Sequence, residues 1–250
     1  MIHPSAIVSR KAKIGKNVSI GHYTVIHDNV EIGNNTTIEG FCEIGYPSPL
    51  AKYQPLVIGR ESHIRSHSIF YSGSTFKEKL VTGHNVTVRE NTFAGINLQI
   101  GTLSDFQGDT TIGDYVRTHS NVHIGKFSIL GNYIWLFPFV VLTNDPHPPS
   151  ETMLGVTIKD YAIIATMAVI LPGVIINEHS LIGAHSIVKD EVPCYTVVAG
   201  NPAKNIGDIR SIKLTDRPEK CAYPWPRHFD RGYPDVVIKK WREKFGDKII

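Results

Sequence analysis

The sequence predicts an all-β solenoid, a parallel β-helix followed by a short α-helical extension. Three observations predict it: aliphatic residues recur every six residues, most glycines share one phase of that period, and asparagine recurs in another. A period of six fits neither the 3.6-residue turn of an α-helix nor a heptad. It fits short strands joined by corners, in which each coil pairs only with the coils above and below it.

The first block of the repeat covers residues 2–45. Its inward position is aliphatic throughout, at Ile2, Val8, Ile14, Ile20, Ile26, Ile32, Ile38 and Ile44. Residues 46–57 break the phase and predict an ordered loop. The second block runs from Ile58 to Leu142, a second loop covers 143–157, and the third block runs from Ile158 to Val188. We interpret the aliphatic residues as core filling.

Glycine and asparagine support the period independently. Chance would place about one sixth of the glycines in any single phase. Twelve of the 21 directly follow the inward position, namely Gly15, Gly21, Gly33, Gly45, Gly59, Gly83, Gly95, Gly101, Gly113, Gly125, Gly131 and Gly183. Asparagine tolerates a left-handed backbone and recurs where a corner is needed. Its positions are Asn17, Asn29, Asn35, Asn85, Asn91, Asn97 and Asn121.

The predicted β-helix domain spans residues 1–204, and the predicted C-terminal extension spans 205–250. Residues 235–246, DVVIKKWREKFG, predict an amphipathic helix that Asp235 caps, with Val237, Trp241 and Phe245 on one face. Residues 223–234 are rich in aromatic residues and proline. Since solenoids need caps, we expect the extension to cover the open end of the coil stack.

The composition is that of an ordinary globular protein, with 42% hydrophobic and 20% charged residues. The net charge is +3, and no run of five Lys or Arg occurs, which disfavours nucleic-acid or polybasic membrane binding. Cys42, Cys194 and Cys221 are odd in number and far apart, which favours a reducing cytoplasm. The N-terminus has no signal-peptide pattern, and residues 161–176 are too few to span a bilayer. We therefore expect a cytoplasmic protein.

The repeat, [Ile/Val/Leu]-Gly-x-x-[small]-x, resembles that of the hexapeptide-repeat acyltransferases over roughly residues 2–198. Residues 169–204, VILPGVIINEHSLIGAHSIVKDEVPCYTVVAGNPAK, are similar to the terminal signature of that family. The resemblance implies triangular coils of three hexads each and a left-handed winding. This hand departs from the usual right-handed rule for parallel crossovers.

A narrower resemblance is carried by TGHNVTVREN (82–91), SNVHIG (120–125) and VVLTNDPHPP (140–149). These segments are similar to bacterial nucleotide-sugar N-acyltransferases. The resemblance implies a homotrimer with active sites between subunits. It also implies transfer of an acetyl or similar acyl group from acyl-coenzyme A to the amino group of a dTDP- or UDP-linked sugar. Such enzymes serve the biosynthesis of surface polysaccharides such as lipopolysaccharide.

Acyl transfer from a thioester to an amine needs a neutral amine, a donor for the oxyanion and close positioning of both substrates. In a coil of three hexads, each residue stacks on the residue at the same place of the next coil, about 4.8 Å away. This places Asp105 beside His123, with Val141 next in the row. The carboxylate would orient the imidazole and raise its basicity. An ordinary surface pair is the alternative interpretation.

The segment FVVLTNDPHPPSETMLG (139–155) provides a second candidate. Its prolines would hold Asn144, Asp145 and His147 rigidly after the last strand of the second block. The resemblance implies that the Asn-Asp pair receives the sugar, with Asp145 accepting from the amine and Asn144 binding the sugar or the oxyanion. His147 resembles the histidine of sugar O-acetyltransferases, which deprotonates a hydroxyl. A proline-rich surface turn is the alternative.

The resemblance places acetyl-coenzyme A along the third block. Small residues there would admit the pantetheine arm, and basic residues nearby would hold the phosphates. The small residues are Ala165, Thr166, Gly183 and Ala184, and the basic residues are Lys189, Lys204 and Arg210. Solvated surface charge is the alternative for the lysines.

For the nucleotide we expect a group drawn from two neighbouring coils, Tyr71, His84, Arg89 and Glu90. A base can stack on Tyr71, and Arg89 can hold a diphosphate. Lys126 lies one coil before Asn144 and would face the sugar. Asp105, the partner of His123, is also expected at the substrate-binding surface.

Three other functions fit the same scaffold. One is a sugar O-acetyltransferase, and another is a trimeric zinc lyase that resembles the γ-class carbonic anhydrases. His119 and His123 lack the spacing typical of that lyase family, and zinc would need three converging ligands. We therefore expect no metal. The third is a non-catalytic scaffold, which the reactive loop disfavours.

Overall fold

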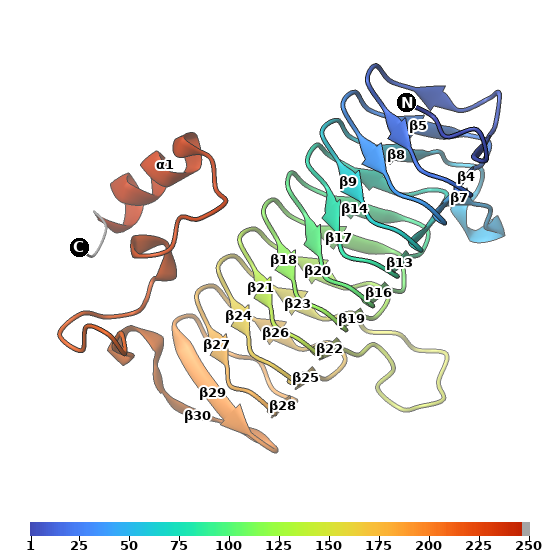
Figure 1. The fold of residues 1–250 in the computed structure, drawn as a ribbon. Coiled ribbons are helices and arrows are strands. Elements are labelled where there is room, and N and C mark those ends of the chain that lie inside the picture. The colour runs from blue at the N-terminus through green and yellow to red at the C-terminus, as the bar shows by residue number, and fades with distance from the viewer. Residues whose placement is uncertain (247–250) are drawn as a thin grey trace.

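The computed structural model describes residues 1–246 and forms a three-sided column of short parallel strands (Figure 1). The last four residues of the predicted extension, 247–250, lie outside the described residues. The predicted fold class is confirmed: the chain is a left-handed parallel β-helix with one short C-terminal helix.

Each side of the column is one sheet, and we call the sheets faces one, two and three in the order of their first strands. Face one contains β1 (Ile7–Val8), β4 (Val25–Ile26), β7 (Glu43–Tyr46), β10 (Ile69–Tyr71), β13 (Thr87–Val88), β16 (Asp105–Phe106), β19 (His123–Ile124), β22 (Val141–Leu142), β25 (Val169–Ile170) and β28 (Ile187–Val188). Face two contains β2 (Lys13–Ile14), β5 (Val30–Ile32), β8 (Leu56–Ile58), β11 (Thr75–Phe76), β14 (Thr92–Ala94), β17 (Thr110–Ile112), β20 (Ile129–Leu130), β23 (Thr157–Ile158) and β26 (Ile175–Ile176).

Face three is the longest sheet and ends in an antiparallel hairpin. It contains β3 (Ser19–Ile20), β6 (Thr37–Ile38), β9 (His63–Ile64), β12 (Val81–Thr82), β15 (Gln99–Ile100), β18 (Arg117–Thr118), β21 (Trp135–Leu136), β24 (Ile163–Ile164), β27 (Leu181–Ile182), β29 (Thr196–Gly200) and β30 (Ala203–Asp208). Only the β29–β30 pair is antiparallel among the described strands. β30 continues past residue 204, where we placed the end of the β-helix domain.

The two predicted loops leave the column between neighbouring strands of the repeat. The first contains the 3-10 helix η1 (Pro49–Ala51), and β8 begins at Leu56. The second lies between β22 and β23. Both loops leave the strand pairing intact, because Glu43 pairs with Ile69 and Ile129 pairs with Thr157 across them. An insertion therefore adds a loop without changing which residues face inward.

The inward aliphatic residues fill the column as predicted, with one exception at its N-terminal end. Phe70, Phe76 and Phe106 are fully buried, and the rings of Phe70 and Phe76 meet edge to face at 5.3 Å. Ile2 is 46% exposed, so the prediction that it fills the core is wrong. The first coil has a neighbour on one side only among the described residues, and its apolar side chains are less completely covered.

The corners use left-handed backbone, as the asparagine pattern predicted. All seven predicted asparagines have φ between 54° and 60°. Aromatic residues occupy the same kind of corner between faces two and three, and their rings stack into a ladder with centroids 4.7–5.4 Å apart. The ladder consists of Tyr115, Tyr133, Tyr161, His179 and Tyr195. Stacking and burial offset the cost of a left-handed bulky residue.

The C-terminal extension packs against this ladder. It contains the 3-10 helices η2 (Ile209–Ser211) and η3 (Trp225–Arg227) and the helix α1 (Asp235–Phe245). Val237, Trp241 and Phe245 are buried on one face of α1, as predicted. The rings of Trp241 and Tyr133 lie 5.2 Å apart, and those of Phe245 and Tyr161 lie 5.4 Å apart.

Two expectations about the extension are wrong. It lies along the side of the column rather than over its open end (Figure 1), where its aromatic residues pack on the ladder and on face three. Asp235 is the first residue of α1, and Pro234 holds the cap position instead. Within residues 1–246, no helix is both long and apolar enough to cross a bilayer.

His179 makes stability depend on pH. Burial within the ladder and the charge of Lys244 lower its pKa from 6.5 to about 4, against weaker opposing effects of Glu178 and Asp160. The unfolded imidazole binds a proton first as pH falls. The stabilisation is therefore complete above pH 6.5 and is lost towards pH 4. We expect His179→Phe to remove at most about 3 kcal/mol of this pH dependence.

Urea unfolding of the wild type and of His179→Phe at pH 7, 5.5 and 4 measures the effect. Phe keeps the stacking on Tyr161 and Tyr195, and the other titrating groups cancel in the comparison. Parallel stability curves for the two proteins would contradict the assignment.

Candidate functional site

The predicted Asp105–His123 pair is present on face one. β16 and β19 are neighbours in parallel register, with Asp105 opposite His123 and His123 opposite Val141. The His123 Nδ1 atom lies 3.2 Å from Asp105 Oδ2, and both side chains are about 40% exposed. The pair is therefore an imidazole oriented by a carboxylate and open to solvent on the outer surface of the column.

The environment of Asp105 keeps this carboxylate charged. Partial burial would raise its pKa, but hydrogen bonds from His123 and Gln107 and the charges of His123 and Arg89 outweigh that effect and lower it. Gln107 donates its side-chain N–H to Asp105. Gln107 was not among the predicted residues, although its position one coil after Arg89 places it in the same row.

A second polar group lies on the edge between faces one and two. Arg89 Nη2 lies 3.1 Å from Glu90 Oε1, and the guanidinium lies 5.7 Å from the ring centre of Tyr71. Lys126 Nζ lies 3.0 Å from Asp109 Oδ2 and 4.0 Å from Glu90 Oε1. The structure thus brings together Tyr71, Arg89 and Glu90, as predicted, and adds Lys126, which we expected to face the sugar.

Glu90, which we expected among the nucleotide-binding residues, lies beneath the surface. Its side chain is fully buried, and its Oε2 atom has no hydrogen-bond partner in the described chain. A buried carboxylate needs nearby positive charge. Glu90 therefore anchors Arg89 and Lys126 from beneath and does not present its carboxylate to solvent.

Asn144 begins the second loop beside this group. A Cβ atom on Gly125 would lie 3.3 Å from the Asn144 Cβ, so the glycine gives Asn144 room at the end of β19. The backbone O of Asn144 accepts a hydrogen bond of 2.8 Å from the Leu154 N–H, which closes the loop. Asn144 therefore lies one coil after Gly125 and Lys126.

Asp145 is engaged by its own loop. Its carboxylate accepts hydrogen bonds from the His147 N–H at 3.0 Å, the Ser150 N–H at 3.0 Å and the Ser150 hydroxyl at 2.6 Å. The bond from the Ser150 hydroxyl is the largest of the effects that lower the pKa of Asp145. The carboxylate stabilises the loop in this structure, whereas we expected it to face an amine. The His147 side chain is exposed.

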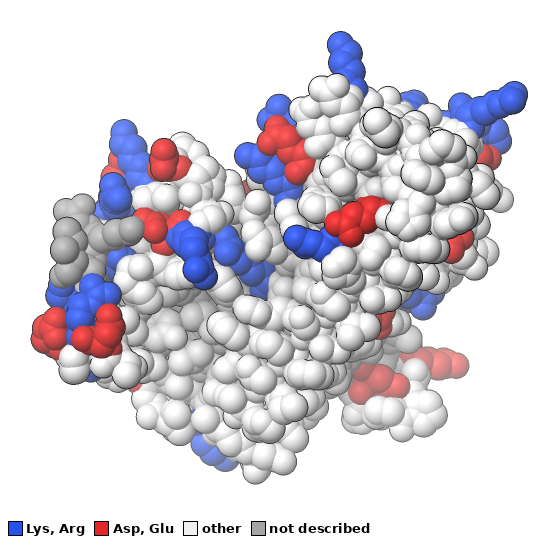
Figure 2. Space-filling view, in the orientation of Figure 1, with Lys and Arg blue, Asp and Glu red and all other residues white. Residues whose placement is uncertain are grey.

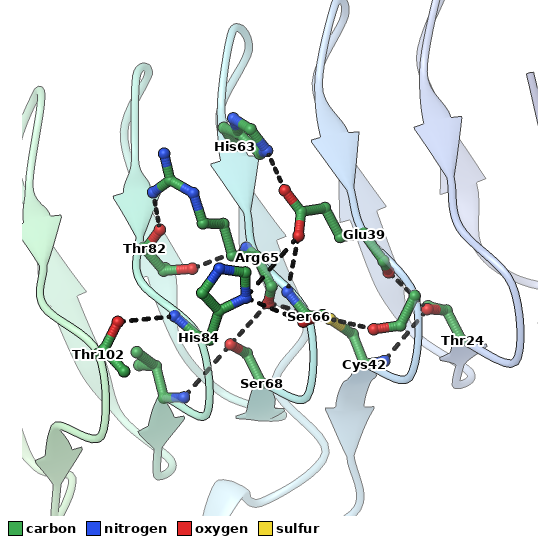
Figure 3. A network of polar contacts seen from close by, with 12 residues as sticks. Thr24, Glu39, Cys42, His63, Arg65, Ser66, Ser68, Thr82, His84 and Thr102 are labelled. Atoms are coloured by element: carbon green, nitrogen blue, oxygen red, sulfur yellow. Dashed lines mark hydrogen bonds and ion pairs between the residues drawn. The ribbon is translucent and has the colours of Figure 1, made fainter.

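His84 does not join Tyr71 and Arg89. It follows β12 on face three, where its Nδ1 lies 2.9 Å from Ser66 Oγ and 3.9 Å from Glu39 Oε2 (Figure 3). Glu39 also bonds His63 at 2.8 Å. The grouping of His84 with Arg89 is wrong because a corner separates the two residues and turns their side chains to different faces.

The small residues predicted to bind coenzyme A lie in different surroundings on the coils of the third block. Ala165 lines an apolar cavity of about 370 Å³ between face three and the extension. Gly183 is covered by β29, since a Cβ on it would lie 2.8 Å from the Ala199 Cβ. Thr166 and Ala184 follow β24 and β27 near the corner with face one.

The predicted phosphate-binding residues are only partly free. Lys189 and Lys204 are exposed, and Lys204 lines a cavity of about 170 Å³ beside β30. Arg210 Nη2 lies 2.5 Å from Asp208 Oδ2, and its guanidinium lies 4.6 Å from the ring centre of Tyr195. Arg210 is therefore held by the end of the ladder.

Residues 1–246 contain no group of three His, Cys, Asp or Glu side chains placed to hold one ion.

Comparison with known proteins agrees with the coil architecture. Residues 11–46 match the family model described as bacterial transferase hexapeptide (six repeats). The chain is 34% identical over 218 residues to the acyl-[acyl-carrier-protein]–UDP-N-acetylglucosamine O-acyltransferase of Aliivibrio salmonicida, covering 85% of this chain and 75% of the relative. The enzyme of the same name from Pseudomonas aeruginosa is 32% identical over 208 residues, covering 82% and 72%.

A solved structure shares the fold. The UDP-N-acetylglucosamine acyltransferase of Bacteroides fragilis aligns with a TM-score of 0.50 and 19% identity, covering 100% of this chain and 87% of that one.

Because the Glu90 carboxylate is buried, we expect the loss of Arg89 to lower the stability of the fold. Arg89→Met removes its nearest countercharge, and we expect the free energy of unfolding to fall by about 3 kcal/mol. The double variant Arg89→Met, Glu90→Gln should recover most of the loss, because no buried charge is then left unpaired.

Urea unfolding compares these variants with Arg60→Met, a matched control. Arg60 lies 3.7 Å from Glu61 at the surface, so its loss should cost less than about 1 kcal/mol. Equal losses for Arg60→Met and Arg89→Met would contradict the anchoring role of Glu90.

Proposed function

The chain belongs to the hexapeptide-repeat acyltransferases, the family of the UDP-N-acetylglucosamine O-acyltransferases, and we propose that it acylates a hydroxyl of a nucleotide-linked sugar. The acyl donor is a phosphopantetheine thioester, carried by an acyl-carrier protein or by coenzyme A. The observation that carries the proposal is the Asp105–His123 pair. The names of the relatives, which specify O-acyl transfer, a UDP-linked sugar and an acyl-carrier protein, support it.

His123 acts as the general base. Its Nδ1 is bonded to Asp105, which leaves Nε2 to take the proton of the acceptor hydroxyl. The oxygen then attacks the thioester carbonyl, a C–O bond forms, and the carbonyl becomes an oxyanion. Collapse of this intermediate breaks the C–S bond, and the imidazolium returns its proton to the departing thiolate. Asp105 stabilises the imidazolium during these steps.

The polar edge beside this pair holds the acceptor. Arg89 offers its guanidinium to the diphosphate, and Tyr71 offers a ring to the base. Lys126 and Asn144 lie one coil apart. Lys126 faces the sugar, and Asn144 donates a hydrogen bond to the oxyanion. An amine acceptor, our expectation from sequence, would need only a hydrogen-bond acceptor such as Asp145. That carboxylate is already used by its own loop.

The donor is less narrowly defined than the acceptor. Acetyl-coenzyme A, which the resemblance implied, and acyl-carrier protein share the phosphopantetheine arm and the thioester. Both belong to the cytoplasm, where we propose that the protein works.

We also propose a homotrimer that buries the apolar part of face two. Exposed apolar side chains point outward from β14, β20 and β26 of this face, at 51% for Phe93, 52% for Ile129 and 36% for Ile175, and Thr111 and Thr157 lie between them. We call this row the apolar stripe. The first strands carry Lys13 and Glu31 at the equivalent positions. The apolar stripe borders the polar edge, so a neighbouring subunit would close the site.

Replacement of His123 tests the catalytic assignment. His123→Ala should lower kcat by about 10²- to 10⁴-fold, because a hydroxyl acceptor needs a general base. Asp105→Asn should have a smaller effect. His3→Ala, an exposed histidine on the first coil, is the matched control. A loss in His147→Ala with normal rates in His123→Ala would move the base to the loop.

Thiol release is measured with acetyl-coenzyme A and with acyl-carrier-protein thioesters over UDP- and dTDP-linked sugars. Hydroxylamine cleaves an ester product and leaves an amide intact. Ester formation supports the proposal, whereas an amide product would restore the amine acceptor.

Replacement of Ile129 tests the trimer. Ile129→Lys places a charge in the apolar stripe, and we expect the trimer to dissociate in sedimentation equilibrium. Glu31→Lys, a change at an outward position on β5 that already carries a charge, should leave it intact. A wild-type monomer, or a trimeric Ile129→Lys, would contradict this interface.

A further inference from the structure

A basic hollow lies between face three and the C-terminal extension. Figure 2 shows Lys and Arg side chains gathered in the depression between the column and the extension. The cavity there has a volume of about 410 Å³. Its lining includes three arginines and no carboxylate, and the basic and aromatic members are Arg65, Arg117, His119, Trp135, Phe229 and Arg231.

The coil register creates the hollow. Arg65, Gly83, Gly101 and His119 follow successive strands of face three at intervals of one coil. The two glycines carry no side chain, so they leave a floor between the arginine and the histidine. Arg117 rises from β18, and Arg231 reaches the same cavity from the extension. Two segments that are far apart in the sequence thus supply one cluster of positive charge.

The positive charge of this cluster is unbalanced. Within residues 1–246, the arginines that form ion pairs with carboxylates are Arg60, Arg89, Arg210 and Arg217. None of the three arginines that line the hollow is among them. Asp230 adjoins Arg231 in sequence but does not line the cavity. Burial and the nearby charge of Arg231 lower the pKa of Arg117. Like charges held together without counterions favour binding of an anion.

Arg117 is the fixed member of the cluster. Its guanidinium lies 4.4 Å from the ring centre of Tyr233 and 4.9 Å from that of Trp135. Its Nη2 donates to the Gly232 carbonyl at 3.2 Å, while its buried Nε has no partner in the described chain. A guanidinium held between two rings is oriented before a ligand arrives, which suits bidentate contact with phosphate.

An apolar cavity adjoins the hollow. Trp135 and Phe229 line both spaces, and the second one continues past Ile163, Leu181 and Trp225. Its volume is about 370 Å³. A ligand that spans the two would have an anionic group at one end and an apolar part at the other.

We propose that the hollow binds the phosphate of an organic phosphate ester whose apolar part enters the adjoining cavity. This site is distinct from the Asp105–His123 pair, since a corner of the column separates His119 on face three from His123 on face one. Phosphate binding does not depend on the proposed function. The identity of the substrate that carries the phosphate rests on the proposed function: the diphosphate of the acceptor is assigned to Arg89, so we assign the phosphopantetheine arm of the donor to the hollow.

Isothermal titration of the full chain with pyrophosphate at low ionic strength tests the site. Arg65→Gln and Arg231→Gln should each weaken binding about tenfold, because each removes a charge-assisted contact. Arg231 is exposed, so its replacement leaves the core unchanged. The matched control is Arg10→Gln, an exposed arginine on the first coil. Unchanged affinity in both hollow variants, or equal weakening in the control, would overturn the proposal.

Competition identifies the source of the phosphate. Coenzyme A or UDP is added to the pyrophosphate complex of the wild type and of Arg231→Gln. Displacement by coenzyme A that is weaker in Arg231→Gln supports a donor site in the hollow, whereas displacement by UDP alone would overturn that assignment. Failure of both to displace pyrophosphate would overturn the claim that an organic phosphate is the ligand. His123→Ala should bind pyrophosphate normally, so a failure of the proposed catalytic mechanism is separable from a failure of this site.

Discussion

The parallel register of the coils is the constraint on which the rest of the structure depends. Each short strand of the column pairs with the strands one coil before and one coil after it, and the pairing continues across the inserted loops. A slip of one residue would turn every inward side chain outward. The continuous core of Phe70, Phe106 and their aliphatic neighbours excludes such a slip. Outward side chains are consequently fixed in rows, and pairs such as Asp105 and His123 meet without any long-range folding of the chain.

The three faces use this register for different purposes. Face one carries the Asp105–His123 pair, and its edge with face two carries Arg89 and Lys126 above the buried Glu90. The corner between faces two and three carries the aromatic ladder that holds the extension. That docking has a consequence for face three, because it brings Arg231 to a cavity that Arg65 and Arg117 line from the column. A structural contact at the ladder thus completes a charged cavity beside it, since Tyr233 contacts both Tyr115 and Arg117.

The sequence predicted the features that depend on the six-residue period. It did not predict contacts between residues that the period does not relate. The strands, the left-handed asparagine corners and the Asp105–His123 pair all follow from the lengths of one hexad and one coil. His84 and Arg89 are close in sequence, but the corner between them separates their faces, and local proximity misled the grouping. The hydrogen bonds of Asp145 arise inside an irregular loop to which no period applies. The contact of Arg117 with Gly232 joins residues that are distant in the sequence, and nothing in the repeat specifies it.

The hydrogen bonds of the second loop also bear on the choice of acceptor. An amine that binds in its neutral form needs only an oxygen to orient it, and Asp145 could serve if its carboxylate were free. In the structure both carboxylate oxygens accept bonds from Ser150 or His147, so using Asp145 would require the loop to lose its own stabilising contacts. His123 carries no such cost, because Asp105 already fixes one ring nitrogen and leaves the other available. A base of this kind is what a hydroxyl requires. The geometry of a single subunit therefore favours ester formation over amide formation.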